Sequence, residues 1–445
     1  MVEPCAAAAE WFVDARFGLF IHWGLYALPA RSSGPRGLPA EWIRYHEELS
    51  DAQYQRYFRH FDPDLYDPRA WAAEAHHAGM RYVVATTKHH DGFCLWDSEL
   101  TDYKAPCTPA ARDLLSPLVD AFRARGLRIG FYHSLVDWHH PQFPVDGIHP
   151  QRHDPAYRAA HAGRDIAAYA EYLHGQVREL LTRYGDVDIV WFDFSYPDPS
   201  MFGDLWAAGF TEGKGREQWR SEELLAMVRR LQPGILVNDR LDVPGDFLTA
   251  EQYQPAGGLR AGGEPAVWEV AQTFNGSWGY DRDNVEWKSV EMLVGMLIDT
   301  VSKGGNLLLN VGPDARGRFQ PEVVERLRGI GTWMHVHSRA IHGCGASAFA
   351  PPPDCRYTQN GDRLYLHLLS WPYGHVHLPG LADRVEYAQL LSDGSQIGTR
   401  VIDPRHEGQM ADMGGLPAGT LTLELPTRRP AVAVPVVELF LTPTP

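Results

Sequence analysis

A carboxylate stands where one of the most apolar runs of the sequence ends. Asp193 closes the run DIVWFD, directly after Trp191 and Phe192. A carboxylate in such surroundings needs hydrogen-bond donors, because otherwise it would take up a proton. A glycosidase nucleophile has this setting, fixed and desolvated beside an anomeric carbon. The same pattern also fits an Asp that caps a turn or binds a metal ion, so spacing alone leaves both interpretations open.

Hydrolysis at a sugar needs a second carboxyl group. A retaining reaction places it about 5–5.5 Å from the first, and an inverting reaction about 6.5–9.5 Å. The candidates are Glu251 in TAEQYQ, Glu269 in VWEVAQ and, earlier in the chain, Glu41 in AEWI. Each of them could instead hydrogen-bond a sugar hydroxyl or complete an ion pair. The sequence does not give their distances to Asp193.

Histidines and aromatic residues also follow apolar runs, in the pairs His22-Trp23, His89-His90 and Tyr132-His133. Histidine clusters at a barrel mouth could bind a metal ion. However, adjacent side chains on an extended segment point to opposite sides, so His89 and His90 are not expected to bind one ion. An HxH pair with matching downstream ligands is not evident either. We therefore expect these residues to hydrogen-bond hydroxyl groups, without a metal ion or organic cofactor. The alternative for one member of each pair is a hydrogen-bonded residue of the core.

Short β-rich apolar runs that alternate with helical patterns precede most of these residues. The expected strands are 17–24, 82–87, 128–134, 188–194, 235–238 and 306–310, and the expected helices are 68–79, 113–126, 156–184, 221–232 and 289–302. This alternation indicates an α/β fold with a parallel sheet covered on its faces. Because the candidate residues lie at strand exits, where a barrel places its chemistry, we predict an irregular (β/α)8 TIM-like barrel.

The composition changes in the Gly- and Pro-rich stretch 343–353, which is typical of a linker. The expected strands beyond it are 363–369, 384–391, 420–425 and 432–441. Short alternating runs separated by turn signals favour a C-terminal antiparallel β-sandwich. We predict a catalytic barrel over residues 1–345 and a sandwich over 346–445. For the sandwich, a structural cap is favoured over a carbohydrate-binding module or a segment that restricts larger substrates at the barrel mouth.

The overall charge and the cysteines exclude several classes of protein. The 445 residues carry a formal net charge of −15 and no basic run, so a nucleic acid is not an expected partner. Five cysteines without a CxxC pair do not suggest a disulfide framework. No apolar stretch is long enough to span a membrane, and no signal peptide is evident. As written, the chain is expected to be cytoplasmic, or secreted or periplasmic if a leader was removed.

Taken together, these segments resemble the α-L-fucosidases of glycoside hydrolase family 29. The matching stretches, in order, are ARFGLFIHWGLYALP (15–29), AEWI (40–43), YVVATTKHHDGFCLWDSELTDY (82–103), GFYHSLVDWHHP (130–141), VDIVWFDF (187–194), LVNDR (236–240), WEVAQTFNGSWGY (268–280) and VSKGGNLLLNVGPDARG (301–317). They cover most of residues 10–340. Any one stretch would be weak support, whereas the ordered series is specific.

The resemblance implies an exo-acting, retaining α-L-fucosidase that releases terminal fucose from a fucosylated oligosaccharide or glycoconjugate. Asp193 matches the family's nucleophile. Glu251, in a segment like the family's TPEQ pattern, is the first choice for the acid/base, and Glu269 is the second. The other expected substrate-binding residues are His22, Trp23, Glu41, Trp42, His89, His90, Tyr132, Trp191, Arg240 and Trp278.

The sequence departs from the family pattern at two places. It has TAEQ rather than TPEQ, and His133 stands where a second Tyr is commoner. The TAEQYQ segment leans toward the branch that prefers α-1,3/1,4-linked fucose. A non-catalytic fucose-binding protein and a metal-dependent barrel hydrolase are the alternative functions. A homo-oligomer is common among such enzymes, and nothing in the sequence tests it.

Overall fold

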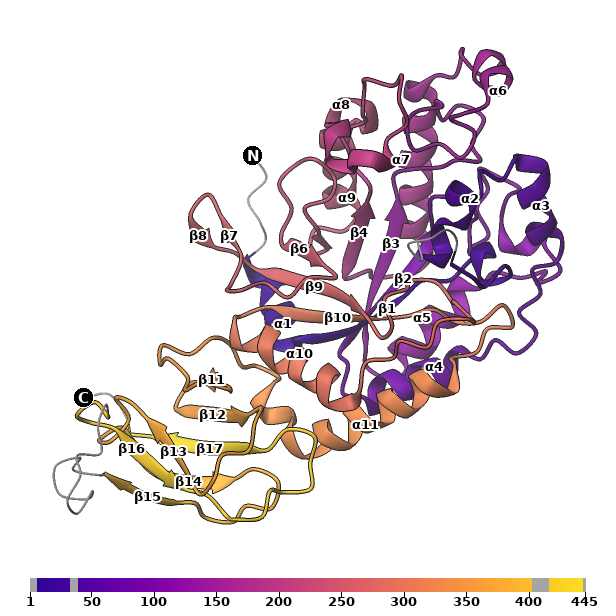
Figure 1. Cartoon of the computed structure of the whole chain (residues 1–445). Helices are drawn as coiled ribbons and strands as arrows, with labels where there is room; N and C mark the ends of the chain where they lie inside the picture. Colours follow the sequence, from indigo (N-terminus) through magenta and orange to yellow (C-terminus); the bar gives the residue numbers. More distant parts are fainter. Residues whose placement is uncertain (1–5, 33–38, 402–415, 443–445) are drawn as a thin grey trace.

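Eight parallel strands form the sheet that carries the candidate residues (Figure 1). The computed structural model describes residues 6–32, 39–401 and 416–442. The strands of this sheet are β1 (Phe17–Ile21), β2 (Tyr82–Lys88), β3 (Arg128–Ser134), β4 (Ile189–Asp193), β5 (Leu236–Val237), β6 (Leu248–Glu251), β9 (Trp268–Thr273) and β10 (Asn306–Val311). Their spatial order is β5-β4-β3-β2-β1-β10-β9-β6.

The two edge strands of this sheet, β5 and β6, meet each other. Asn238 and Phe247 form a parallel bridge just beyond the ends of the paired segments. The backbone N–H of Asp246 also donates to the Val237 carbonyl at 2.7 Å. These contacts close the sheet into a barrel through very little backbone pairing. We call residues 236–251, which contain this closure, the seam.

Helices follow most strands and cover the outside of the barrel (Figure 1). The longer ones are α1 (Ala6–Ala15), α3 (Asp51–Arg59), α4 (Pro68–His77), α5 (Leu115–Arg123), α7 (Ile166–Arg183), α9 (Ser221–Leu231), α10 (Val290–Ser302) and α11 (Pro321–His337). The short ones are α2 (Ile43–His46), α6 (Pro155–Ala160) and α8 (Arg216–Trp219). None of the helices in these described ranges is both long and apolar enough to cross a membrane.

The barrel is irregular on the side of the seam. No helix lies between β5 and β9 in this fully described stretch, where a hairpin of β7 (Arg260–Ala261) and β8 (Glu264–Pro265) follows β6 instead. The prediction of an irregular (β/α)8 barrel is therefore confirmed. The expected helix 156–184 is divided into α6 and α7, because Asp165 caps the start of α7 with its side chain.

Side chains alternate along each strand between the barrel interior and the helices. Phe20, Tyr82 and Trp191 belong to the interior cluster, whereas Phe17 and Leu19 belong to the outer core. The Phe20 ring lies 5.2 Å from the Trp191 ring between centroids. Large aromatic rings therefore fill the interior and support the open end of the barrel from below.

The C-terminal strands form two antiparallel sheets (Figure 1, lower left). One has the order β11 (Cys355–Asn360), β12 (Arg363–Leu368), β17 (Val436–Leu441), β14 (Val385–Leu390), and the other has β13 (His375–Leu378), β16 (Leu421–Glu424), β15 (Gly398–Val401). Leu366, Leu439 and Leu423 from both sheets share one hydrophobic core, as expected of a sandwich. The division of the chain at residue 345 stays a prediction.

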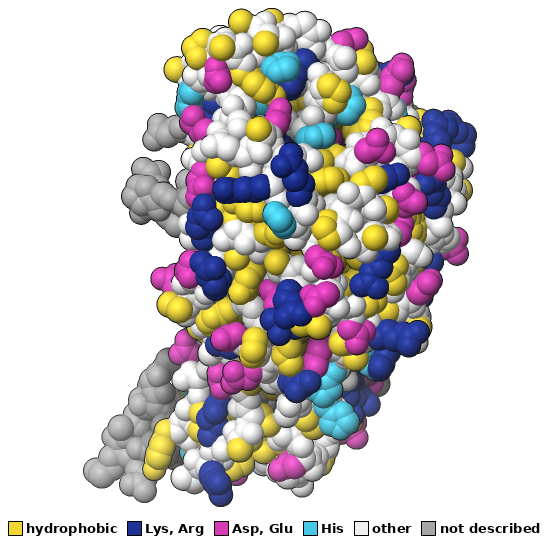
Figure 2. Space-filling view, turned by 90° about the vertical axis from the view of Figure 1, so that its right-hand side faces the viewer, with side chains coloured by type: hydrophobic (Ala, Val, Ile, Leu, Met, Phe, Trp, Pro, Cys, Tyr) yellow, Lys and Arg dark blue, Asp and Glu magenta, His cyan; other side chains and the backbone are white. Residues whose placement is uncertain are grey.

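Polar contacts attach this sandwich to the barrel helices. The Arg356 guanidinium pairs with Asp299 of α10 at 2.7 Å, and the Trp333 indole of α11 donates to the Val434 carbonyl at 2.8 Å. On the face of the molecule drawn in Figure 2, basic and acidic side chains are intermixed.

Candidate active site

A small cavity of about 50 Å³ lies among the residues at the carboxyl ends of the strands. It brings together most of the residues that were expected to form the site. The lining residues are Phe20, His22, Glu41, Trp42, His89, His90, Tyr132, Trp191, Asp193, Phe194, Arg240, Glu251 and Trp278. They come from segments that are far apart in sequence, so the barrel is what assembles this cavity.

Asp193, the last residue of β4, is held by donors on both of its carboxylate oxygens. The Tyr132 hydroxyl donates to Oδ2 at 2.7 Å, and Arg240 Nη1 donates to Oδ1 at 3.0 Å. Burial, reinforced by the negative charge of Asp193, raises the pKa of Tyr132 well above its ordinary value, so the phenol keeps its proton. This arrangement stabilises an ionised carboxylate in a buried place.

Arg240 connects two carboxylates at the mouth of the cavity. Besides Asp193, its Nη1 contacts Glu251 Oε2 at 2.7 Å. Burial alone disfavours the charge of the guanidinium, but the Glu251 and Asp193 carboxylates outweigh this effect and raise the pKa of Arg240 above its usual value. The Arg240 guanidinium also lies over the Trp191 ring, 4.5 Å from its centroid. The cation is therefore fixed beside both acids.

Glu251 and Glu269 differ sharply in access to the cavity. The Glu251 side chain is 39% exposed and lines the cavity. Glu269 is 1% exposed and does not line the cavity. Its oxygens accept hydrogen bonds from the Tyr82 hydroxyl and from the Trp191 indole, the latter at 3.1 Å. Glu269 thus lies in the barrel interior and supports Trp191, instead of facing a substrate.

Trp23 is the other expected site residue that the structure does not bring into the cavity. Its ring packs 5.2 Å from the Trp71 ring, and its indole N–H donates to the Asp314 carbonyl at 3.0 Å. The extended backbone continues past β1, because the His22 N–H still donates to the Val311 carbonyl. His22 and Trp23 therefore point to opposite sides, and only His22 faces the site.

The hydrogen-bond network assigns the proton position of His22. The side-chain amide of Asn310 donates to the Trp278 carbonyl at 2.7 Å, so its Oδ1 must be the atom that faces His22 Nδ1, also at 2.7 Å. Nδ1 therefore carries the ring proton. Burial lowers the pKa of His22 to about 3, so the ring is neutral and Nε2 is a hydrogen-bond acceptor.

His90 is assigned in the same way through Ser134. The Ser134 hydroxyl donates its one proton to the Val136 carbonyl at 2.9 Å, so it accepts from His90 Nδ1 at 2.6 Å. Burial lowers the pKa of His90 to about 3, which leaves Nε2 as an acceptor. Nε2 lies 3.9 Å from Asp193 Oδ2. Two acceptors at this separation are suited to bind a hydroxyl group placed between them.

Both His89 and His90 line the cavity, contrary to the expectation that they point apart. Strand β2 ends at Lys88, so the two residues lie in the turn that follows, and their ring centroids are 4.0 Å apart. Across the described part of the chain, no group of three or more His, Cys, Asp or Glu side chains is arranged to hold a metal ion.

Glu41 closes the cavity from the segment between β1 and β2. Its Oε2 accepts from the Gly279 N–H at 2.9 Å, whereas its buried Oε1 has no hydrogen-bond partner among the described residues. Burial raises the pKa of Glu41 to about 7. His89 Nδ1 is likewise buried without a described partner. Unpartnered polar atoms around a cavity are suited to a ligand that carries several hydroxyl groups.

The chain is similar to fucosidases of known sequence and structure. A family model described as alpha-L-fucosidase matches residues 3–339. The chain belongs to glycoside hydrolase family 29. It is 30% identical over 364 residues to the alpha-L-fucosidase of Dictyostelium discoideum, covering 75% of this chain and 71% of that one. It is therefore a glycoside hydrolase with α-L-fucosidase relatives.

Solved structures of family 29 enzymes match nearly the whole chain. Alpha-L-fucosidase isoenzyme 1 from Paenibacillus thiaminolyticus has 42% sequence identity and a TM-score of 0.87, with 98% of this chain and 99% of that chain covered. A family 29 α-L-fucosidase from Bacteroides thetaiotaomicron, solved as a trapped covalent intermediate with 2-fluoro-fucosyl fluoride, is 26% identical with a TM-score of 0.82. The match covers 98% of this chain and 96% of that chain.

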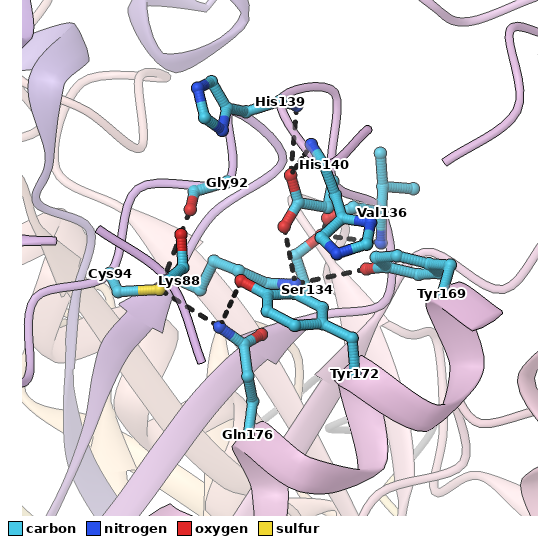
Figure 3. Close-up of polar contacts among 12 residues, drawn as sticks. Lys88, Gly92, Cys94, Ser134, Val136, His139, His140, Tyr169, Tyr172 and Gln176 are labelled. Carbon is cyan, nitrogen blue, oxygen red and sulfur yellow. Dashed lines mark hydrogen bonds and ion pairs between the residues drawn. The ribbon is translucent and has the colours of Figure 1, made fainter. Parts of the chain in front are cut away.

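A buried ion pair links Lys88, the last residue of β2, to Asp137 in this family 29 enzyme (Figure 3). Lys88 Nζ contacts Asp137 Oδ2 at 3.3 Å and donates to the Tyr169 hydroxyl at 3.1 Å. Asp137 Oδ1 accepts from the backbone N–H groups of His139 and His140. The pair therefore joins the end of β2 to the turn that follows β3, the two segments that place His90 and Ser134.

Sequence reasoning missed four residues that shape the cavity or orient its histidines. Phe20 and Phe194 line the cavity, Asn310 orients His22, and Ser134 orients His90. Asn310 and Ser134 each end an expected strand, so the strand-exit rule could have found them. Phe194 has a positive φ of 77°, which no local sequence pattern predicts. The strain turns the chain out of β4 immediately after Asp193.

Proposed function

We propose that this family 29 enzyme is an exo-acting, retaining α-L-fucosidase with Asp193 as the nucleophile and Glu251 as the acid/base. The observation that carries the proposal is the shared contact of both carboxylates with Arg240 Nη1, at 3.0 and 2.7 Å. Because one guanidinium nitrogen contacts an oxygen of each carboxylate, the two acids are held close together, which supports the shorter separation typical of retaining enzymes. The geometry therefore favours retention of configuration.

The first step forms a glycosyl-enzyme ester. Asp193 attacks the anomeric carbon while Glu251 gives its proton to the leaving oxygen, so the bond to the second sugar breaks as the ester bond forms. Glu251 is now the ionised carboxylate and Asp193 is neutral. Arg240 remains beside both, so the same cation balances the charge of whichever acid is ionised.

The second step releases fucose. Glu251 takes a proton from a water molecule, and the oxygen of that water displaces Asp193 from the anomeric carbon. Glu251 regains its proton and Asp193 its charge. Two inversions at one carbon give overall retention, and no cofactor or metal ion enters the proposed reaction.

The remaining lining residues fit the hydroxyl and methyl groups of fucose. We assign hydroxyl recognition to His22, His89, His90 and Glu41, which face the cavity with acceptor atoms or unpartnered buried atoms. We assign contact with the apolar side of the sugar to Trp278. The small size of the cavity supports removal of a single terminal residue. For the linkage we propose α-1,3/1,4, on the basis of the TAEQYQ segment.

The test is NMR detection of the anomer of fucose released first. The substrates are an aryl α-L-fucoside and α-1,2-, α-1,3- and α-1,4-fucosylated oligosaccharides. We expect α-fucose to appear first and the α-1,3- and α-1,4-linked substrates to be depleted. Initial β-fucose would contradict retention, depletion of the α-1,2-linked substrate alone would contradict the linkage, and bound but unhydrolysed fucoside would favour a binding protein.

The acid/base is tested with leaving groups of different acidity. Glu251→Ala is expected to lower kcat/KM on natural glycosides by about 10²–10⁴-fold, but far less on a dinitrophenyl fucoside, whose departure needs no proton. Glu269→Ala serves as the comparison, because Glu269 does not face the cavity. If Glu269→Ala shows this dependence on the leaving group and Glu251→Ala does not, the assignment is wrong.

A further inference from the structure

A second, larger cavity of about 490 Å³ adjoins the small one. The two cavities share Asp193, Phe194, Arg240 and Glu251. If Asp193 and Glu251 act as proposed, the bond that breaks lies between them, at this shared boundary. The sugar attached to fucose must then occupy the larger cavity.

One side of the larger cavity is apolar. It is formed by Phe194, Pro197, Met201 and Phe202, in the segment that follows β4. The Phe194 and Phe202 rings are stacked with centroids 5.5 Å apart, and Met201 is 64% exposed. A flat surface of this kind packs against the C–H face of a sugar ring.

Another part of the lining of the larger cavity is acidic and comes from the seam. Asp239 Oδ1 accepts from the Thr249 N–H and hydroxyl, at 3.1 and 2.7 Å. Asp242 Oδ2 accepts from the Arg216 N–H at 2.8 Å. One oxygen of each carboxylate is thus engaged, and the other has no hydrogen bond to any described residue. These free oxygens can accept from sugar hydroxyl groups.

The charges around this cavity do not balance. Among its lining residues the basic side chain is Arg240, and Asp193 and Glu251 already share that cation. Asp239 and Asp242 are left as additional negative charges. The nearest cation to Asp242 is Arg216, whose half-exposed side chain lies 3.9 Å away. A ligand that carries its own negative charge would therefore be repelled.

We propose that this cavity is the subsite for the sugar attached to fucose, and that Asp239 and Asp242 make the enzyme select a neutral sugar over a sulfated or carboxylated one. The inference rests on the proposed fucosidase activity and specifies its substrate class. Because the two carboxylates are partly exposed, each should contribute a few-fold of discrimination, on the order of tenfold together, and salt should weaken it.

The experiment compares a neutral fucosyl disaccharide with the same disaccharide sulfated at O6 of the second sugar, in the linkage that the enzyme hydrolyses. The ratio of the two kcat/KM values is measured at 20 mM and 500 mM NaCl, with the aryl fucoside as the check on activity itself. For the parent enzyme we expect the neutral substrate to be favoured on the order of tenfold at low salt and only about twofold at high salt.

Asp242→Asn removes the charge and keeps the shape. Asp242 has a positive φ of 57°, a conformation that Asn tolerates well. We expect this variant to reduce the low-salt ratio about threefold. The matched control is Asp120→Asn, the same charge change on the exposed face of α5 and outside both cavities, which should leave the ratio unchanged.

The outcomes separate this inference from the function on which it rests. A low-salt ratio near one, with the aryl fucoside still hydrolysed, overturns the inference and leaves the fucosidase function standing. A ratio that persists at 500 mM NaCl and in Asp242→Asn is steric, and it also overturns the role of charge. Failure to release fucose from any of the substrates overturns both.

Discussion

Replacing Lys88 by methionine removes the cation from a buried ion pair whose other member, Asp137, cannot reach water. The two side chains are 0% and 2% exposed. Burial alone raises the pKa of Asp137, and the Lys88 ammonium is the largest influence that lowers it again, so the net pKa lies below its ordinary value. Without Lys88, the carboxylate retains the two backbone donors of His139 and His140 but no adjacent ammonium.

The expected loss follows from the burial of the pair. Removing one partner of a buried pair costs about 3–5 kcal/mol, because an uncompensated charge remains. At about 2 °C for each kcal/mol in a chain of this size, the thermal midpoint should fall by roughly 6–10 °C. The activity should fall as well, because the turn that contains Asp137 holds the turn after β2, where the Trp138 N–H donates to the carbonyl of the cavity residue His90 at 2.9 Å.

The assay measures unfolding midpoints at a fixed scan rate from pH 5 to pH 8, for Lys88→Met and for the double variant with Asp137→Asn. In the single variant burial raises the pKa of Asp137 above its value in the unfolded chain. Stability is therefore greatest at low pH and decreases as pH rises toward that raised pKa. The double variant cannot ionise at residue 137, so the pH dependence that Lys88→Met adds to the thermal midpoint should be absent from it. A Lys88→Met midpoint within 2 °C of the parent at every pH would refute this reasoning.

Three further perturbations test other parts of the structure. Asp193→Ala is expected to lower kcat by at least about 10⁴-fold without changing the circular dichroism spectrum, and a tenfold loss or less would argue against a nucleophile. Burial raises the pKa of both Glu41 and Glu269 to about 7. The free energy of unfolding should therefore decline between about pH 4.3 and pH 7. Glu269→Gln should remove on the order of 3 kcal/mol of that decline, and an unchanged dependence of the unfolding free energy on pH would be the contrary result. Ser134→Ala should lower kcat/KM about tenfold with little change in the thermal midpoint, because the His90 ring loses the hydroxyl that fixes its proton. Kinetics equal to those of the parent enzyme would show that the Ser134 hydroxyl is dispensable.

The sequence pattern located strands where burial is continuous and apolar. The expected strand 128–134 coincides with β3, in which every residue after Arg128 is buried. In contrast, β6 and β9 were not expected. β6 is short and only half-buried, and β9 contains Glu269 and Gln272, whose burial depends on distant hydrogen-bond partners such as Tyr82. A local pattern cannot register a partner nearly two hundred residues away.

The direction of side chains near strand ends depended on where each strand stops. Backbone pairing continues beyond β1, so His22 and Trp23 alternate and only one faces the cavity. The pairing of β2 ends at Lys88, so the side chains of His89 and His90 do not alternate, and both face the cavity. A difference of one or two residues in the end of a strand thus decides which side chains meet a substrate, and the sequence specifies ends less firmly than strands.

The seam gives the barrel two regions of unequal stiffness. The histidines follow strands that pair with neighbours on both sides, and Asp193 ends β4, whose pairing with β3 runs to its last residue. In contrast, Asp239 and Asp242 lie where a single bridge and a few hydrogen bonds hold the edges together. Substitutions of Asp239 and Asp242 that leave Arg240 and Glu251 in place are therefore expected to change the larger cavity without disturbing the strands that hold the fucose ring. In evolutionary terms, we expect recognition of the released sugar to be inherited with the barrel and recognition of its neighbour to diverge more readily among descendants. Exchange of Asp239 and Asp242 between relatives, with Arg240 and Glu251 kept, is accordingly the graft expected to carry one preference without the other.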